Sequence, residues 1–233
     1  MTTIACPVRP ATAEWRLAAR DIGSLSPGIV PFGLMMGITA TAMHSGALAT
    51  LTGAALVFGG SAQLTTLSLL HLGTGLLAAV VSGAVVNSRV LLYGAALGPR
   101  FADHPRWFRW LGASVIQDQT YLSAIGRPEI RGAAFLRYWL WLGFSLLLVW
   151  MSAVAAGIAL GPLAPPLPHL PLVGTALFVA MLAPRLVARP AVAGAGAAAL
   201  VALAVGLLAP SLAIIAGTAA GLLVSLKVEG ISS

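Results

Sequence analysis

The chain has 233 residues, of which 59% are hydrophobic and only 8% are charged, and its mean hydropathy is +0.96. A soluble domain carries about a quarter charged residues, so this composition excludes a soluble globular protein and indicates an integral membrane protein built from spanning helices. The net charge of +7 does not indicate nucleic-acid binding, because most arginines stand between apolar runs, as the positive-inside tendency predicts.

The first apolar run covers residues 22–43, and the preceding residues 10–21 are expected to form an interfacial helix. Pro27, Pro31 and Gly33 interrupt this run. Because proline removes a backbone donor and clashes with the preceding turn, the sequence predicts a kinked or broken helix. Broken helices in transporters expose backbone groups that bind substrate or ions, which makes Pro31 and Gly33 candidate site positions. A harmless proline kink is the alternative.

The second run, residues 48–70, has polar and flexible residues at its centre, namely Gly59, Gly60, Ser61 and Gln63. Two adjacent glycines predict a break at mid-membrane, and the two half-length pieces would suit a re-entrant hairpin. One continuous crossing is the alternative. Gln63 beside Ser61 would bind a zwitterion or pair with the backbone groups that the break frees.

The third run, residues 75–97, contains Asn87 and Arg89 among otherwise apolar or small residues. A charge at membrane depth costs at least about 2.5–3.5 kcal/mol, so Arg89 is expected to face the protein interior or a wet cavity. There its guanidinium would bind a substrate carboxylate or an internal acid; snorkelling to the interface is the alternative. In a continuous helix one stripe would contain Ser82, Val85, Arg89 and Tyr93, and Asn87 would lie near the opposite face with Gly83 and Gly94.

The fourth run, residues 107–126, is a poor spanning candidate because Asp118 lies in its middle, between Gln117 and Gln119. Three roles fit this carboxylate: counter-ion to Arg89, ligand for a substrate ammonium, or proton carrier. The alternative is a solvated acid at the surface. Like the second run, this segment is expected to enter and leave the membrane on one side.

The remaining apolar runs cover residues 135–160, 172–186, 191–208 and 211–226. If basic stretches mark the cytoplasmic side, both termini are cytoplasmic and the chain makes six crossings with two re-entrant segments. Eight full crossings are the competing count. The expected fold is therefore an all-α polytopic bundle of six to eight membrane segments, with an N-terminal segment (1–21), one transmembrane domain (22–227) and a tail (228–233).

Sequence motifs for the common enzymatic chemistries are missing. The chain has no GxxxxGK[ST] loop, no HExxH and no GxSxG, and its four histidines show no ligand spacing. No metal site, cofactor or enzymatic activity is expected.

Several of these stretches resemble the AzlC family, the large subunits of bacterial branched-chain amino-acid exporters. Residues 85–97 resemble the family signature N-x-R-x-x-L-Y-G-A-x-L, and residues 58–63 are similar to its F-A-G-(A/S)-x-Q segment. Residues 25–37 and 177–182 resemble its first helix and its L-F-x-x-L-L helix. Asp118 falls where the family has T-D-E, with Gln117 and Gln119 replacing Thr and Glu, and an acid usual before the L-F helix is missing at residues 171–173.

The resemblance implies a permease of the bacterial inner membrane that exports Leu, Ile, Val or similar amino acids such as methionine, together with a small AzlD-type subunit. Without an ATP motif, export would be driven by an ion gradient or by the membrane potential. Two other functions fit the residues: a facilitative, channel-like pore for small neutral solutes, and a membrane scaffold subunit that transports nothing.

Overall fold

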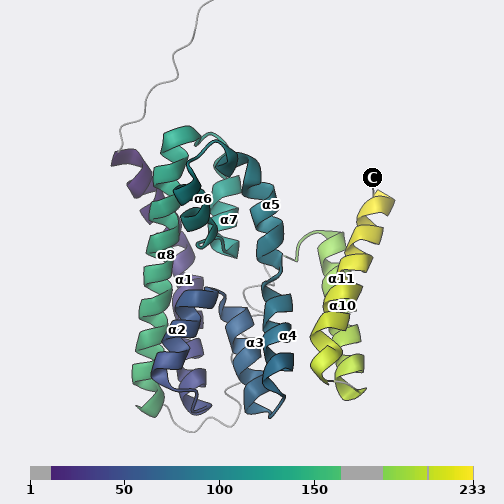
Figure 1. The fold of residues 1–233 in the computed structure, drawn as a ribbon. Coiled ribbons are helices and arrows are strands. Elements are labelled where there is room, and N and C mark those ends of the chain that lie inside the picture. Colours follow the sequence, from purple (N-terminus) through teal and green to yellow (C-terminus); the bar gives the residue numbers. More distant parts are fainter. Residues whose placement is uncertain (1–11, 164–185, 209, 233) are drawn as a thin grey trace, which may run out of the picture. The chain divides into compact units, whose positions relative to one another are not determined.

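The computed structural model describes residues 12–163, 186–208 and 210–232, and these residues form helices without any strand (Figure 1). The helices in the first half are α1 (Thr12–Ala42), α2 (Ala47–Val57), α3 (Gly60–His71), α4 (Leu76–Asn87) and α5 (Arg89–Ala102). They are followed by α6 (Arg106–Ala113), α7 (Asp118–Ile125), α8 (Gly132–Leu160), the 3-10 turn η1 (Gly161–Leu163), α10 (Arg189–Leu208) and α11 (Pro210–Ser232). The predicted all-α fold is confirmed.

Four described segments are long and apolar enough to cross a membrane: Glu14–Ala42, Leu76–Ala102, Gly132–Leu163 and Arg189–Leu208. The chain is thus a helical membrane protein. The crossing predicted at residues 172–186 lies almost entirely outside the described residues. The interfacial helix expected at residues 10–21 is not separate, since α1 begins at Thr12 and continues without a break to Ala42.

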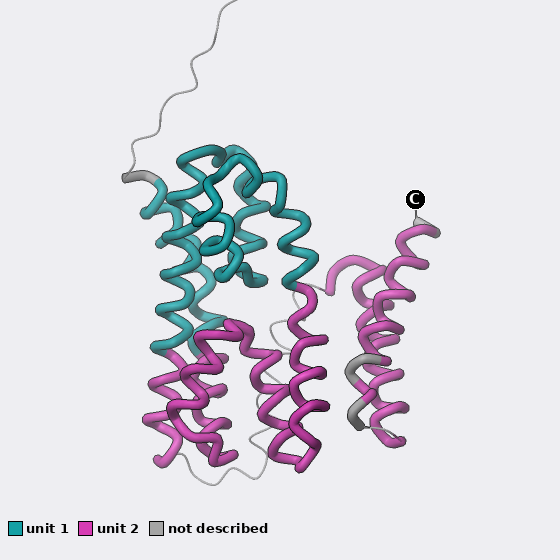
Figure 2. Tube along the Cα trace, viewed as in Figure 1, with its two compact units in different colours: residues 1–30, 90–152 teal, residues 31–89, 153–233 magenta. Residues whose placement is uncertain are grey.

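The chain forms two compact units, each made from two stretches of sequence (Figure 2). Unit 1 contains residues 1–30 and 90–152, and unit 2 contains residues 31–89 and 153–233. Each unit shows the same order of elements: part of a long helix, a pair of short helices, and part of a second long helix. In unit 2 the order is the end of α1, then α2 and α3, then α4. In unit 1 it is α5, then α6 and α7, then the first part of α8.

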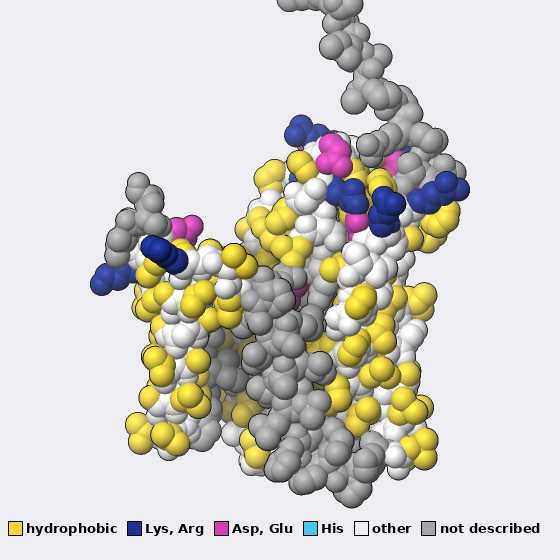
Figure 3. Space-filling model, turned by 180° about the vertical axis from the view of Figure 1, so that it is seen from behind, with side chains coloured by type: hydrophobic (Ala, Val, Ile, Leu, Met, Phe, Trp, Pro, Cys, Tyr) yellow, Lys and Arg dark blue, Asp and Glu magenta, His cyan; other side chains and the backbone are white. Residues whose placement is uncertain are grey.

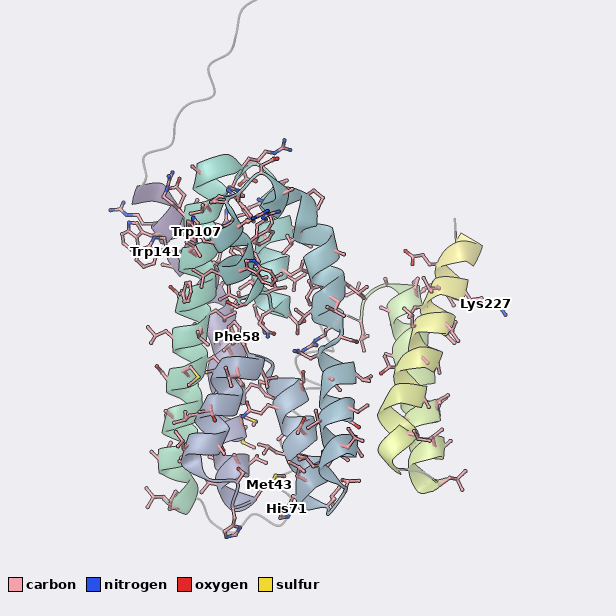
Figure 4. All side chains as sticks on the ribbon, viewed as in Figure 1. Met43, Phe58, His71, Trp107, Trp141 and Lys227 are labelled. Carbon is pink, nitrogen blue, oxygen red and sulfur yellow. The ribbon has the colours of Figure 1, made fainter. Side chains whose placement is uncertain are left out.

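The α2–α3 pair of unit 2 is a helical hairpin. The Gln63 side-chain Nε2 donates to the Thr50 carbonyl at 2.8 Å, although 13 residues separate them. In one continuous helix those residues would lie about 20 Å apart. Met43, just after α1, and His71, at the end of α3, lie at the same end of unit 2, away from Phe58 at the turn (Figure 4). The predicted break is therefore present, and the chain reverses there instead of crossing.

The α6–α7 pair of unit 1 is a second hairpin. Phe108 of α6 stacks on Phe101 of α5 with ring centroids 5.3 Å apart. The adjacent residue of α5, Arg100, donates from Nη1 to the Ala124 carbonyl of α7 at 2.6 Å. Both arms thus contact the same part of α5, while each arm has only eight residues, about 12 Å. Neither arm is long enough to span a bilayer core of about 30 Å.

The break predicted in the first helix is wrong. Pro31 and Gly33 lie inside α1, which is one helix over 31 residues, so of the two predicted forms, kinked or broken, the broken one is contradicted. A proline removes one backbone donor, and in membrane helices the neighbouring bonds and packing compensate for that loss. Pro31 and Gly33 therefore do not supply a broken-helix site. Pro31 does begin the part of α1 that belongs to unit 2.

The continuous helix predicted for residues 75–97 is also wrong in detail, because its hydrogen-bond ladder is interrupted at Ser88. The Ser88 backbone N–H donates to the Val85 carbonyl three residues back, at 3.2 Å, and its hydroxyl donates to the same carbonyl at 2.7 Å. This tightened turn ends α4 and begins α5 at Arg89. The predicted stripe is thus divided between α4 (Ser82 and Val85) and α5 (Arg89 and Tyr93).

Helices α10 and α11 pack closely through small residues, as the Ala- and Gly-rich sequence predicts. A Cβ on Gly217 would lie 2.8 Å from the Ala198 carbonyl, and one on Gly221 would lie 2.9 Å from the Ala198 side chain. Ser225 of α11 donates to the Pro190 carbonyl of α10 at 3.1 Å.

Candidate functional site

Arg89 and Ser61 meet where the α2–α3 hairpin turns. The guanidinium Nη2 of Arg89 donates to the Ser61 Oγ at 2.9 Å. Ser61 is the second residue of α3, and the residue before the helix, Gly59, has no side chain that accepts from the first-turn N–H groups. A guanidinium therefore lies beside a helix N-terminus, which itself carries partial positive charge. Two positive features at one point favour an anion between them.

Asn87 packs against the backbone at the same turn. Its Oδ1 lies 2.7 Å from the position that a Cβ on Gly59 would occupy. This oxygen is buried and has no hydrogen-bond partner among the described residues. The close helix contact predicted for Asn87 is thus made with Gly59. Since Gly59 has φ −144°, which any residue adopts, Asn87 explains the need for glycine there.

Gln63 links the two arms of the hairpin. It is 6% exposed, and its Nε2 lies 2.7 Å from where a Cβ on Gly53 would be. Together with the bond to the Thr50 carbonyl, this places the amide between α2 and α3. Of the two predicted roles, pairing with backbone is the one seen here. Gln63 Oε1 is buried without a hydrogen-bond partner in the described parts of the chain.

Asp118 and Tyr93 meet at the turn of the α6–α7 hairpin in unit 1. The Tyr93 Oη donates to Asp118 Oδ1 at 2.8 Å. The Tyr93 ring stacks on Tyr121, with centroids 4.4 Å apart and planes 14° apart. Asp118 is the first residue of α7, where a carboxylate interacts favourably with the helix dipole. Gln117 caps the same helix through a reciprocal bond with Thr120.

Arg89 belongs to unit 2 and Asp118 to unit 1, and each makes its own contact within its unit. The Arg89–Asp118 pair expected from the sequence stays a prediction. Arg89 and Tyr93 are four residues apart on α5, so they lie on the same face of the helix, about one turn apart.

The sequence did not reveal an ion-pair network that ties α1 to α8 in unit 1. Arg127 donates from Nε and Nη2 to the two Asp21 oxygens at 2.8 and 2.6 Å, and Tyr138 donates to Asp21 Oδ2 at 2.6 Å. The hydrogen bond to Asp21 raises the pKa of Arg127. Glu14, which is 2% exposed, accepts from Arg137 at 2.9 Å. The one signal in the sequence is the seven-residue spacing of Glu14 and Asp21, which places both acids on one helix face.

Arg100 of α5 binds the end of the second hairpin. Its guanidinium donates to the carbonyls of Ala124 at 2.6 Å, Ile130 at 2.6 Å and Arg127 at 3.3 Å. It also lies over the Phe135 ring, 4.1 Å from the centroid. Ala124 lies at the end of α7, and Arg127 and Ile130 lie in the segment that follows, so Arg100 of α5 ties both to one point.

Exposed arginines gather at one end of unit 1, above a flank of yellow hydrophobic side chains (Figure 3). They are Arg16, Arg20, Arg106, Arg109 and Arg131. Exposed tryptophans lie near them, Trp107 at 54% and Trp110 at 81%. Aromatic and basic residues at one level are typical of a membrane–water interface. The described residues contain no group of His, Cys, Asp and Glu that fits a metal ion.

Comparison with known proteins gives one match. The family described as AzlC protein matches residues 24–163, well over half of the chain. No curated protein and no solved structure matches the sequence. The matched residues include both helical hairpins and the α4–α5 segment that contains Asn87 and Arg89. The chain therefore belongs to the AzlC family, a transporter-type family associated with branched-chain amino-acid transport.

Proposed function

We propose that this protein is a permease of the bacterial inner membrane that exports branched-chain amino acids and similar ones such as methionine. It works as a secondary transporter with a small AzlD-type membrane subunit, and both of its termini are cytoplasmic. Family membership and the four long apolar segments support this proposal.

The observation that carries the proposal is the contact of Arg89 with Ser61 at the start of α3. An amino-acid exporter must hold a carboxylate inside the membrane without leaving its charge unpaired. A guanidinium offers five N–H donors in a fork that fits a carboxylate, and the adjacent helix N-terminus adds backbone donors at Gly60 and Ser61. We assign the substrate carboxylate to this position in unit 2. A broken helix with an anionic group at its N-terminus is a recurrent substrate site in transporters.

Asp118 is assigned the coupling role, either as ligand for the substrate ammonium or as proton carrier. Its carboxylate is partly buried, lies at the start of α7 and accepts from Tyr93, which supports this role. The neighbouring Gln117 and Gln119 carry no charge, so Asp118 is the one acid in the 107–126 segment, and coupling either depends on it or works differently from that of its relatives.

The test is efflux of labelled valine, leucine and methionine from proteoliposomes, with and without the small subunit and at two pH gradients. We expect amino-acid efflux that falls at least about tenfold in Arg89→Ala and is partly restored in Arg89→Lys, because lysine keeps the charge but loses the fork. Arg106→Gln removes an exposed arginine of unit 1 and is the matched control. No amino-acid flux under any condition would refute the proposal.

Two outcomes would identify other functions. Flux without proton movement that tolerates Asp118→Asn would indicate a facilitative pore. A scaffold subunit would be indicated if the protein showed no flux and Arg89→Ala changed its assembly with the small subunit.

A further inference from the structure

A cavity lies in unit 1, outside the contact of Tyr93 with Asp118. It has a volume of about 450 Å³ and is formed where α5 ends and α8 begins, with residues from the end of α7 and the connecting segments. Its apolar lining includes Leu97, Ile125 and Phe135, and its charged lining includes Asp103 and Arg131. The space is ample for one amino acid, and it is lined by residues at the ends of two spanning segments, so it adjoins water.

The charged groups of this cavity are available to a ligand. Arg131 is exposed and uses its Nε to donate to the Pro128 carbonyl at 3.2 Å, which leaves its two terminal nitrogens without a partner in the described residues. Asp103 is exposed and makes no hydrogen bond or ion pair within the described part of the chain. In contrast, Arg100 in the same cavity is held by three carbonyls. The cavity thus presents two guanidinium groups and one carboxylate, and of the two arginines Arg131 is the one whose terminal nitrogens make no hydrogen bond within the described residues.

The combination of groups selects among ligand classes. Asp103 repels a simple anion and offers a partner to an ammonium, whereas Arg131 and Arg100 repel a simple cation and attract a carboxylate. A zwitterion satisfies both, and the apolar lining takes an aliphatic or thioether side chain. The exposed arginines gather at this end of unit 1, which on the positive-inside rule is the cytoplasmic end, where an exporter takes up its substrate.

We infer that this cavity is a capture site for an apolar amino acid, with the carboxylate on Arg131, the ammonium on Asp103 and the side chain against Leu97, Ile125 and Phe135. The inference rests on the proposed export function and adds a binding site separate from Arg89. Occupancy would also reach Arg100, which holds the segment after α7, so the captured substrate contacts the base of the α6–α7 hairpin.

The experiment is equilibrium binding of labelled leucine to the full chain in nanodiscs. Wild type should show two classes of leucine site. The double variant Asp103→Asn/Arg131→Gln should lose the cavity site, and Arg89→Ala should keep it. Single variants separate the two charges. Arg131→Gln should weaken leucine at this site by about tenfold or more while leaving isoamylamine, which lacks the carboxylate, unchanged. Asp103→Asn should likewise weaken leucine binding at this site, and it should leave the binding of 4-methylpentanoate, which lacks the ammonium, unchanged.

Arg106→Gln is the matched control, because Arg106 is an exposed arginine at the same end that does not line this cavity. Unchanged leucine sites in a correctly folded Asp103→Asn/Arg131→Gln protein would overturn the inference. The inference would also be overturned if these substitutions released bound phosphatidylethanolamine and left leucine binding intact. The zwitterion in the cavity would then be a lipid headgroup. If efflux depends on Arg89 but not on this cavity, only the capture site fails; if wild type neither binds nor exports leucine, the proposed function fails.

Discussion

Arg127 holds Asp21 with two parallel hydrogen bonds of 2.8 and 2.6 Å, across 106 residues of sequence. The same carboxylate accepts from Tyr138 of α8, so three segments of unit 1 meet at one acid. Because bidentate Arg–carboxylate pairs are stronger and more specific in geometry than other ion pairs, this contact fixes the segment after α7 to both long helices of the unit.

Arg127→Gln is therefore expected to destabilise the protein by about 1–3 kcal/mol, since it leaves a partly buried carboxylate with one of its two partners. The loss of stability is measured as a decrease in the apparent melting temperature of the purified protein in detergent. Tyr138→Phe removes a single hydrogen bond and should lower stability less, by about 1 kcal/mol. The control is Arg109→Gln, which removes an exposed arginine of α6; an equal loss there would contradict the assignment.

Gly59→Ala is expected to destabilise the α2–α3 hairpin by about 1–3 kcal/mol through crowding. The new methyl group would lie 2.7 Å from Asn87 Oδ1. Because the φ of −144° suits alanine, the effect should be steric and should shrink in the double variant Gly59→Ala/Asn87→Ala. A double-mutant cycle in thermal stability measures this coupling. Gly75→Ala, with open space around its Cβ, is the control; additive effects would show that Asn87 is not the neighbour that matters.

Gln63→Leu keeps the approximate volume but removes the donor to Thr50, so we expect the two arms of the hairpin to separate more easily. The loss is about 1–3 kcal/mol, because the buried Thr50 carbonyl loses a donor. Hydrogen exchange should increase in residues 50–63 and stay unchanged in the α6–α7 hairpin of unit 1. Uniformly faster exchange in both hairpins would instead indicate a general loss of fold.

Tyr93→Phe removes the hydrogen bond to Asp118 and keeps the ring that stacks on Tyr121. We expect normal folding and efflux reduced roughly two- to tenfold, the range that corresponds to one hydrogen bond. Tyr121→Phe keeps the stacked ring and should retain wild-type efflux. Efflux from Tyr93→Phe equal to wild type would show that positioning of Asp118 does not limit transport.

The sequence predicted those features that depend on local chemistry. Gly59 and Gly60 disfavour a continuous helix because glycine loses the most backbone freedom in one, and the chain does reverse there. Pro31 looked equally disruptive, but one lost donor in a long helix is compensated by its neighbours. The interruption at Ser88 carries a weaker signal, a serine whose hydroxyl competes for a local carbonyl. The contacts of Arg100, Arg127 and Arg137 join segments far apart in the chain, and no pattern within a single sequence specifies such partners.

The division of the chain has a consequence for its synthesis. Unit 1 begins with the first part of α1 and is completed only by residues 90–152. At translation rates of about 5–20 residues per second, Asp21 waits roughly 5 to 20 seconds for Arg127 to be made. During that interval Asp21 lacks its hydrogen bonds from Arg127 and Tyr138, and Glu14 lacks the one from Arg137. The N-terminal part of α1 must therefore stay near water or be shielded by the insertion machinery until the sixth to eighth helices arrive.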